Sequence, residues 1–163
     1  MATQPQENNN VAMQQDNDVM SMLKKQRSPT GEMSMGEIML ADLQRAGMED
    51  QLATIYEMLK TMVENGKARI MRANNSLLVY RIVGDGEVEF DLMTADSPKT
   101  LVKSTREFFE AMKKAGFKRG MGMTEDAQLV KLLERTGLNI KTKQIQRFDG
   151  EKAIPSIGVL VEI

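Results

Sequence analysis

From residue 34 onward the apolar residues follow two periodicities in turn, and this alternation constrains the fold more than any other feature of the chain. Ser34 and Glu37 form an S-x-x-E capping box, which predicts that a helix begins there. Apolar residues with a 3.6-residue period predict a second helix over about residues 50–64. The ordered part of the chain is therefore expected to open with a helical pair over residues 34–64.

Strand patterns follow the helical pair. Residues 67–73 and 77–83 are rich in residues that favour strands, and Gly84-Asp85-Gly86 predicts a tight hairpin turn after the second segment. Apolar and acidic residues then alternate over residues 87–92, which is typical of a strand with one solvated face. Three consecutive strands are therefore expected.

Helices and strands alternate in the remainder of the chain. Ser97 and Pro98 have the pattern of an N-cap followed by proline at the first helical position, and this helix is predicted to end at Gly116. Thr124 is predicted to cap a further helix that ends at Gly137, where we expect a positive φ. The strands predicted around these helices cover residues 117–123, 139–148 and 157–163. The predicted order is α-α-β-β-β-α-β-α-β-β, with a sheet-and-helix core over residues 67–163.

Composition excludes several kinds of chemistry. The chain contains no Cys and no His, which excludes disulfides, thiolate nucleophiles, His- or Cys-based zinc sites and Ser-His-Asp catalysis. The 22 basic and 23 acidic residues nearly cancel, which argues against nucleic acid or an anionic membrane as a partner. No stretch approaches the roughly 20 apolar residues that span a bilayer, and the N-terminus lacks the pattern of a signal peptide.

The stretch TEDAQLVKLLERTGL, Thr124–Leu138, predicts a helix that leads into a glycine-containing corner before the last hairpin. Together with the element order, it resembles the GCN5-related N-acetyltransferase (GNAT) family over about residues 35–163. In that family two helices precede an antiparallel meander, and a long helix, a strand, a second helix and a terminal β-pair follow. The resemblance implies an α/β (α+β) domain over residues 32–163, with a mixed, largely antiparallel sheet flanked by helices. The composition of residues 1–31 predicts an extended N-terminal arm, disordered or ordered by a partner, before this domain.

The resemblance is degenerate at the positions that carry chemistry in the family. The family's acyl-CoA signature, Q/R-x-x-G-x-G/A, precedes the long helix, where this chain has Thr94–Thr100 without glycine. Pro98 lacks an N–H donor, and Asp96 is expected to repel a phosphate. Leu133 stands at the place of the family's tyrosine proton donor, and a base is matched only by Glu89 or Asp91. These departures predict no acetyl-CoA binding.

Three polar groups have both a functional and a structural interpretation. Glu87, Glu89 and Asp91 could bind a divalent cation or supply a base, or could form the solvated face of a strand. Residues 119–122, Arg-Gly-Met-Gly, could form a phosphate loop or mark a close approach of backbone at a strand end. The basic residues of the long helix could meet nucleic acid or an acidic protein, or could face solvent. These are Lys99, Lys103 and Arg106, with Lys113, Lys114, Lys118 and Arg119 beyond.

The segment over residues 1–31 has a different composition from the rest. Residues 4–17 are rich in Gln and Asn, and no aromatic residue occurs before Tyr56, so the segment cannot form a core of its own. A short apolar patch followed by basic residues is expected to bind a partner protein that orders the arm. The predicted partner-binding residues are Val19, Met20, Met22, Leu23, Lys24, Lys25 and Arg27.

The run Met93–Asp96 before a basic helix, followed by LVKLLERTGL and a C-terminal hairpin, also resembles GNAT-like internal virion proteins of tailed phages, the podoviruses. This resemblance implies a non-catalytic structural or assembly protein of a phage virion, present in multiple copies and bound to other virion chains. Such a protein would be located in the virion after assembly in the host cytoplasm, or in the cytoplasm if the chain is not viral. An acyl-CoA-dependent N-acyltransferase, active or relic, is the alternative.

On the virion hypothesis the chain is not an enzyme. It is then expected to have no catalytic, cofactor-binding or metal-binding residues, no cofactor and no small-molecule substrate. A nucleic-acid-binding module based on the basic helix is a third possibility, which the charge balance disfavours.

The prediction for the arm can be checked by limited proteolysis of the free protein. We expect trypsin to cleave first at Lys24, Lys25 or Arg27 and to leave a stable fragment from about Met33 onward, because a segment without a core is accessible to protease. Mass spectrometry of the early fragments identifies the sites. Resistance of these three bonds in the free protein would contradict the prediction.

Overall fold

The structure, a computed structural model, describes residues 32–163. The predicted arm over residues 1–31, with its seven proposed partner-binding residues, lies outside the described residues. The chain divides into two compact units, of which the first ends at Lys67 and the second covers Ala68–Ile163. Among the described residues no helix has both the length and the apolar character needed to cross a membrane.

The described part of the first unit is the helical pair. Helix α2 covers Met35–Arg45, a short 3-10 helix η1 covers Glu49–Gln51, and α3 covers Leu52–Glu64. The predicted capping box is confirmed, because the Glu37 amide donates to Ser34 Oγ at 3.1 Å and the Ser34 amide donates to Glu37 Oε1 at 2.8 Å. Both N-terminal donors are thereby satisfied, which fixes the start of α2 at the expected residue.

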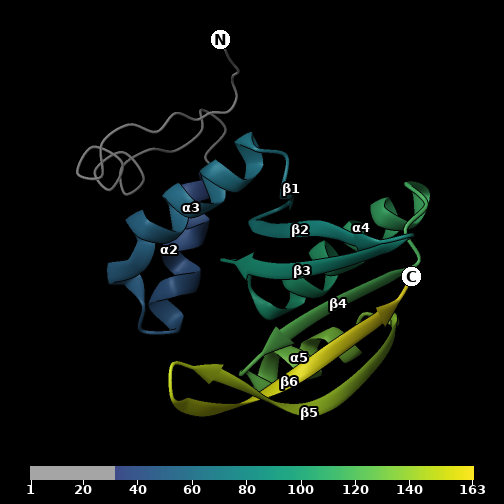
Figure 1. Ribbon diagram of the computed structural model, residues 1–163. Helices are drawn as coiled ribbons and strands as arrows, with labels where there is room; N and C mark the ends of the chain where they lie inside the picture. The colour runs from purple at the N-terminus through teal and green to yellow at the C-terminus, as the bar shows by residue number, and fades with distance from the viewer. Residues whose placement is uncertain (1–31) are drawn as a thin grey trace. The chain divides into compact units, whose positions relative to one another are not determined.

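The second unit is built on a six-stranded sheet with the order β1-β2-β3-β4-β6-β5 (Figure 1). All neighbouring strands pair antiparallel except β3 and β4, which are parallel. The predicted fold class, a mixed and largely antiparallel sheet flanked by helices, is therefore confirmed, and the element order agrees with the sequence prediction. The strands are β1 Arg69–Ala73, β2 Ser76–Gly84, β3 Glu87–Thr94, β4 Arg119–Thr124, β5 Asn139–Asp149 and β6 Lys152–Glu162.

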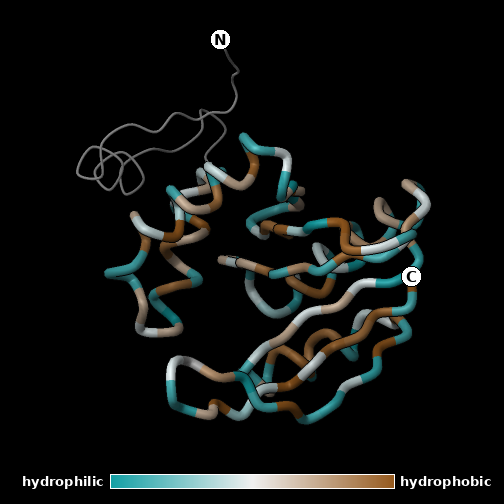
Figure 2. The backbone as a smooth tube through the Cα atoms, in the orientation of Figure 1, coloured by the Kyte–Doolittle hydropathy of each residue, from teal (hydrophilic) through white to brown (hydrophobic). Residues whose placement is uncertain are grey.

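Two helices of the second unit connect to the parallel strands. Helix α4, Pro98–Lys114, joins β3 to β4, and α5, Ala127–Glu134, follows β4. α4 contacts β1, β2 and α5, and α5 contacts β4, so the two helices cover the same face of the sheet. Hydrophobic and hydrophilic segments alternate along the strands in Figure 2, but four consecutive residues at the start of β2, Ser76–Val79, are buried, so both faces of the sheet are covered there.

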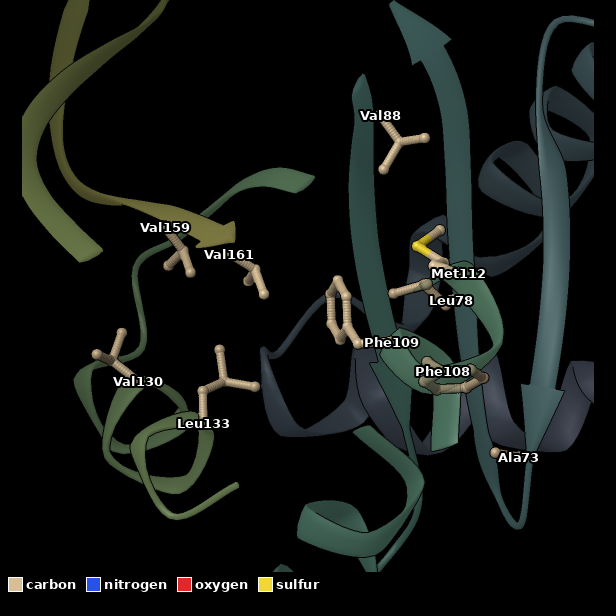
Figure 3. Close-up of a cluster of buried hydrophobic side chains, with 10 residues drawn as sticks. All are labelled: Ala73, Leu78, Val88, Phe108, Phe109, Met112, Val130, Leu133, Val159 and Val161. Carbon is tan, nitrogen blue, oxygen red and sulfur yellow. The ribbon is translucent and has the colours of Figure 1, made fainter. Parts of the chain in front are cut away.

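The core of this unit lies between the sheet and the two helices. Phe108 and Phe109 of α4 are each only 2% exposed, and Figure 3 places Phe109 in the middle of the cluster. Buried side chains of β2, β3, β6 and α5 surround it, so the two aromatic rings join both halves of the sheet to α4. The cluster consists of Ala73, Leu78, Val88, Phe108, Phe109, Met112, Val130, Leu133, Val159 and Val161.

Several predicted boundaries differ from the structure, most of them by one or two residues. β6 begins at Lys152 rather than at residue 157, and it continues through Pro155. β4 pairs with β6 only as far as Ile157, so the missing N–H of Pro155 breaks no hydrogen bond of a central strand. The cap of α5 is Asp126 rather than Thr124, because the Asp126 carboxylate accepts from the amides of Gln128 and Leu129.

The corner after α5 is confirmed as a left-handed glycine turn. Gly137 has a φ of +79°, and an added Cβ would meet nothing within 4 Å. The end of α5 is also held by Arg106 of α4, whose Nε donates to the carbonyl of Thr136 at 2.8 Å. Arg106 therefore belongs to the packing of α4 against α5 and not to a free basic surface.

We expect Gly137→Val to lower the free energy of unfolding by about 1–3 kcal/mol, because a β-branched residue is strained at positive φ. Since the position is open, Gly137→Asn should cost less, as asparagine tolerates this conformation. Urea denaturation of both variants measures the difference. Equal stabilities of the wild type and Gly137→Val would contradict the requirement for glycine.

Candidate functional site

The candidate site is the place where the parallel strands β3 and β4 separate. Their register contains three pairs, Glu87 with Arg119, Val88 with Gly120, and Glu89 with Met121. Beyond these pairs β3 remains paired with β2 as far as Thr94, and β4 remains paired with β6 as far as Thr124. Each strand therefore follows its outer neighbour, and Figure 1 shows the two arrows separating toward their tips.

Ion pairs hold the narrow end of this separation. Arg119 Nη1 donates to Glu87 Oε2 at 2.8 Å, and Arg119 Nε donates to Glu162 Oε2 at 3.4 Å. The hydrogen bonds to Glu162 and Glu87 raise the pKa of the Arg119 guanidinium above its ordinary value. Arg119 thus joins β3, β4 and β6 at the end where β3 and β4 are still paired. Glu87 is the partner of this arginine on β3.

An aromatic ring occupies the helix-covered side at the point of separation. Phe90, the first residue of β3 beyond the last pair, packs edge-to-face on Phe109 with ring centroids 5.3 Å apart. A Cβ on Gly122 would lie 3.1 Å from the Phe90 ring and 3.1 Å from its carbonyl oxygen, and one on Gly120 would lie 3.2 Å from the ring. Both glycines are needed for this close approach. Gly120 and Gly122 therefore serve packing rather than a phosphate loop.

Both helices that cover the sheet begin at the wide end, but their N-termini differ. The three residues Ala95–Ser97 lead from β3 to α4, whose first turn has no acidic residue and whose N-cap Ser97 makes no capping hydrogen bond to the helix. Ser97 Oγ instead donates to Thr100 Oγ1 at 3.1 Å. In α5 the Asp126 carboxylate accepts hydrogen bonds from the corresponding backbone amides, those of Gln128 and Leu129. Of these two N-termini, only that of α4 is available to an anion.

Asp96, which was expected to repel a phosphate, instead organises the loop before α4. Its carboxylate accepts from the Asn75 amide at 3.0 Å, from Ser76 Oγ at 2.6 Å and from Ser104 Oγ at 2.8 Å. Asn75 and Ser76 belong to the turn and start of β2, on the side of β3 away from β4. The carboxylate is therefore directed toward β2, and the sequence pattern did not reveal this role.

The two predicted base candidates lie on the sheet face opposite the Phe90 ring, because side chains alternate along β3. Glu89 lies at the last paired position and accepts from Arg81 Nε at 2.7 Å, while Asp91 follows two residues later. Both are exposed, and the structure brings them to the edge of the separation. No group of His, Cys, Asp and Glu side chains within residues 32–163 is arranged to hold a metal ion.

Leu133, and not a tyrosine, stands at the sequence position of the family's proton donor. The side chain of Leu133 is 5% exposed and packs in the core, so it does not contribute to the candidate site. Tyr80 packs edge-to-face on Phe117 with ring centroids 6.1 Å apart. Tyr56 belongs to α3 of the first unit, where burial, with a smaller contribution from the charge of Glu57, raises the pKa of its hydroxyl.

No family model and no curated protein matches the chain. Among solved structures the chain is similar to the microcin self-immunity acetyltransferase MccE in complex with acetyl-CoA and AMP, with 12% identity, a TM-score of 0.51 and coverage of 71% of this chain and 72% of that one. A spermidine N-acetyltransferase SpeG chimera from Vibrio cholerae has 9% identity and a TM-score of 0.51, with coverage of 68% and 76%. RimL, a ribosomal-protein acetyltransferase in complex with coenzyme A, has 8% identity and a TM-score of 0.50, with coverage of 71% and 73%.

The fold is the GNAT fold. At these identities the similarity establishes the fold alone. It gives no support to the expected virion resemblance.

Two predictions of the sequence analysis are overturned by these neighbours. The chain was expected not to be an enzyme, yet its fold is that of acetyltransferases. It was also expected to have no small-molecule substrate, yet two of these neighbours hold CoA or acetyl-CoA. Both expectations rested on the absence of residues from the family's acyl-CoA motif, chiefly the glycines of the loop before α4. The absence of these residues carries no information about two features of the structure, the separation of β3 from β4 and the uncapped start of α4.

The role of Asp96 can be tested by stability. Asp96→Ala should lower the free energy of unfolding by about 2–4 kcal/mol, because Ser76 and Ser104 are both 0% exposed and would lose their shared acceptor. Chemical denaturation followed by circular dichroism measures the loss. Glu125→Ala, which removes an exposed ion pair with Arg147, is the matched control and should change stability by less than about 1 kcal/mol. Equal effects of the two variants would contradict the structural role.

Proposed function

We propose that the chain is an acyl-CoA-dependent N-acyltransferase whose acyl donor binds between β3 and β4. The observation that carries this proposal is the parallel pair that separates after three residue pairs, with the uncapped start of α4 at its wide end. Ligands of α/β sheets bind at the carboxyl ends of parallel strands, next to helix N-termini. β3 and β4 are the parallel pair of this sheet.

The separated strand edges suit the pantetheine arm of CoA. Beyond Glu89, β3 continues alongside β2, whereas its register with β4 has ended. Backbone N–H and C=O groups at such an edge need hydrogen-bonding partners. The pantetheine arm is a narrow chain that carries amide groups, so it can lie between the strands and hydrogen-bond to both edges.

The phosphates of CoA suit the start of α4. The amides of Lys99 and Thr100 have no acceptor within the helix, and the positive end of the helix dipole points toward the loop. Lys99 is exposed, and Lys103 follows one turn later. These side chains supply positive charge on the first two turns of α4, next to a loop that has no glycine for a backbone cradle. The three hydrogen bonds to Asp96 hold its carboxylate toward β2 and away from this anion.

With the phosphates at α4, the arm runs toward the narrow end and places the thioester where the strands meet, next to Glu89. The acceptor amine attacks the thioester carbonyl carbon, so that a C–N bond forms as the C–S bond breaks. Glu89 takes the proton that the amine loses, and CoA leaves as a thiolate that water protonates. The ion pair with Arg81 is exposed and weak, and it leaves the carboxylate accessible.

Binding of the donor is the first test. Acetyl-CoA at about 100 times its dissociation constant should stabilise the protein by roughly 2.7 kcal/mol, seen as a raised Tm in a thermal shift assay. Lys99→Glu should weaken the affinity for acetyl-CoA measured by calorimetry, because it places negative charge beside the phosphates. The absence of any interaction with acetyl-CoA in both assays would refute the proposed function.

Catalysis is the second test. Because the chain has no Cys, release of the CoA thiol can be followed with a thiol reagent without background, using a panel of polyamines, amino acids and peptides as acceptors. Glu89→Gln should lower kcat by about 10²-fold or more if this carboxylate is the base. Glu87→Gln, a carboxylate on the same strand face that is paired with Arg119, is the matched control and should retain kcat within about twofold. A loss confined to Asp91→Asn would move the base to Asp91.

A further inference from the structure

The helix-covered side of the candidate site is closed at the point where β3 and β4 separate. The Phe90 ring lies against the backbone of β4 at Gly120 and Gly122. On its other side it packs edge-to-face on Phe109, which belongs to the core. Phe109 is 2% exposed, so the ring against which Phe90 packs is itself part of the buried core. Behind the separation, the paired residues Glu87–Glu89 and Arg119–Met121 close the sheet itself.

An acyl group that reaches this point has few directions in which to extend. The paired strands lie ahead of it, and the Phe90 and Phe109 rings lie on the side of α4. The opposite face carries Glu89 and Met121 and is the side from which the acceptor must approach the base. A short acyl group would stay in front of the Phe90 ring, whereas a longer chain would have to displace the ring or extend along the path of the acceptor.

We propose that Phe90 is the residue that limits the length of the acyl group, so that the site takes acetyl and similarly short acyl donors. This inference rests on the proposed function and adds the specificity-determining residue. Gly120 and Gly122 are needed to hold the Phe90 ring in this position, because a side chain at either residue would displace the ring. Replacing Phe90 by alanine would open a passage bordered by Phe109 and the two glycines, into which an acyl chain can extend.

The test compares affinities for acetyl-CoA and hexanoyl-CoA by calorimetry, which needs no acceptor. The wild type should bind hexanoyl-CoA at least about tenfold more weakly than acetyl-CoA, since a single methylene that a site cannot accommodate lowers affinity by about tenfold or more. Phe90→Ala should bind hexanoyl-CoA at least about tenfold more tightly than the wild type does, so that the ratio of its affinities for hexanoyl-CoA and acetyl-CoA rises by a similar factor. Phe90→Leu should give an intermediate ratio, and it replaces the alanine variant if that variant does not fold.

Phe117→Ala is the matched control, because Phe117 also packs edge-to-face on another aromatic ring, that of Tyr80, yet contacts neither glycine. Its ratio of the two affinities should equal that of the wild type. Equal binding of both donors by the wild type, or a ratio that Phe90→Ala and Phe90→Leu leave unchanged, overturns the role of Phe90 alone. A wild type that binds neither donor overturns the proposed function as well, so the two failures are distinguishable.

Discussion

The separation of β3 from β4 is the constraint on which the rest of the candidate site depends. Each strand keeps its ladder of hydrogen bonds to one outer neighbour, β2 for β3 and β6 for β4, and the two strands share only three residue pairs. Arg119 joins the strands at the paired end, and the Phe90 ring fills the helix-covered side at the point of separation. A sheet interrupted in this way keeps its strand pairing toward both edges, and the proposed function places the acyl donor between the separated ends of β3 and β4.

The loop before α4 shows how a missing sequence pattern can mislead. It has no glycine, and its acidic residue predicts repulsion of an anion. In the folded protein the Asp96 carboxylate accepts from the Asn75 amide and from two buried serines, so its charge is used to hold the loop against the start of β2. The start of α4, three residues from the end of β3, is left without an acidic neighbour in its first turn. Closely packed glycines occur on β4 instead, where they accommodate the Phe90 ring.

The two faces of β3 serve different purposes. Val88, Phe90 and Leu92 contribute to the core or pack against it, while Glu87, Glu89 and Asp91 project from the other face. The alternation in the sequence predicts this division and treats the three acidic residues alike. The neighbouring strands distinguish them, since Glu87 pairs with Arg119 of β4 and Glu89 with Arg81 of β2. Their proposed roles differ for this reason, and no pattern within β3 could have separated them.

The sequence by itself determined the elements and most of their limits, because these depend on neighbours along the chain. Examples are the capping box at Ser34, the glycine turn at Gly137 and the order of helices and strands, all of which the structure confirms. The tertiary structure alone decided where β3 and β4 part, which way the Asp96 carboxylate is directed and which ring lies on Gly120 and Gly122. These features depend on contacts between segments far apart in the sequence, between β2, β3, β4 and α4. Local propensity and periodicity carry no information about such contacts. The family resemblance could therefore single out Glu89 and the loop before α4, but only the assembled sheet shows how they lie about the separation of β3 and β4.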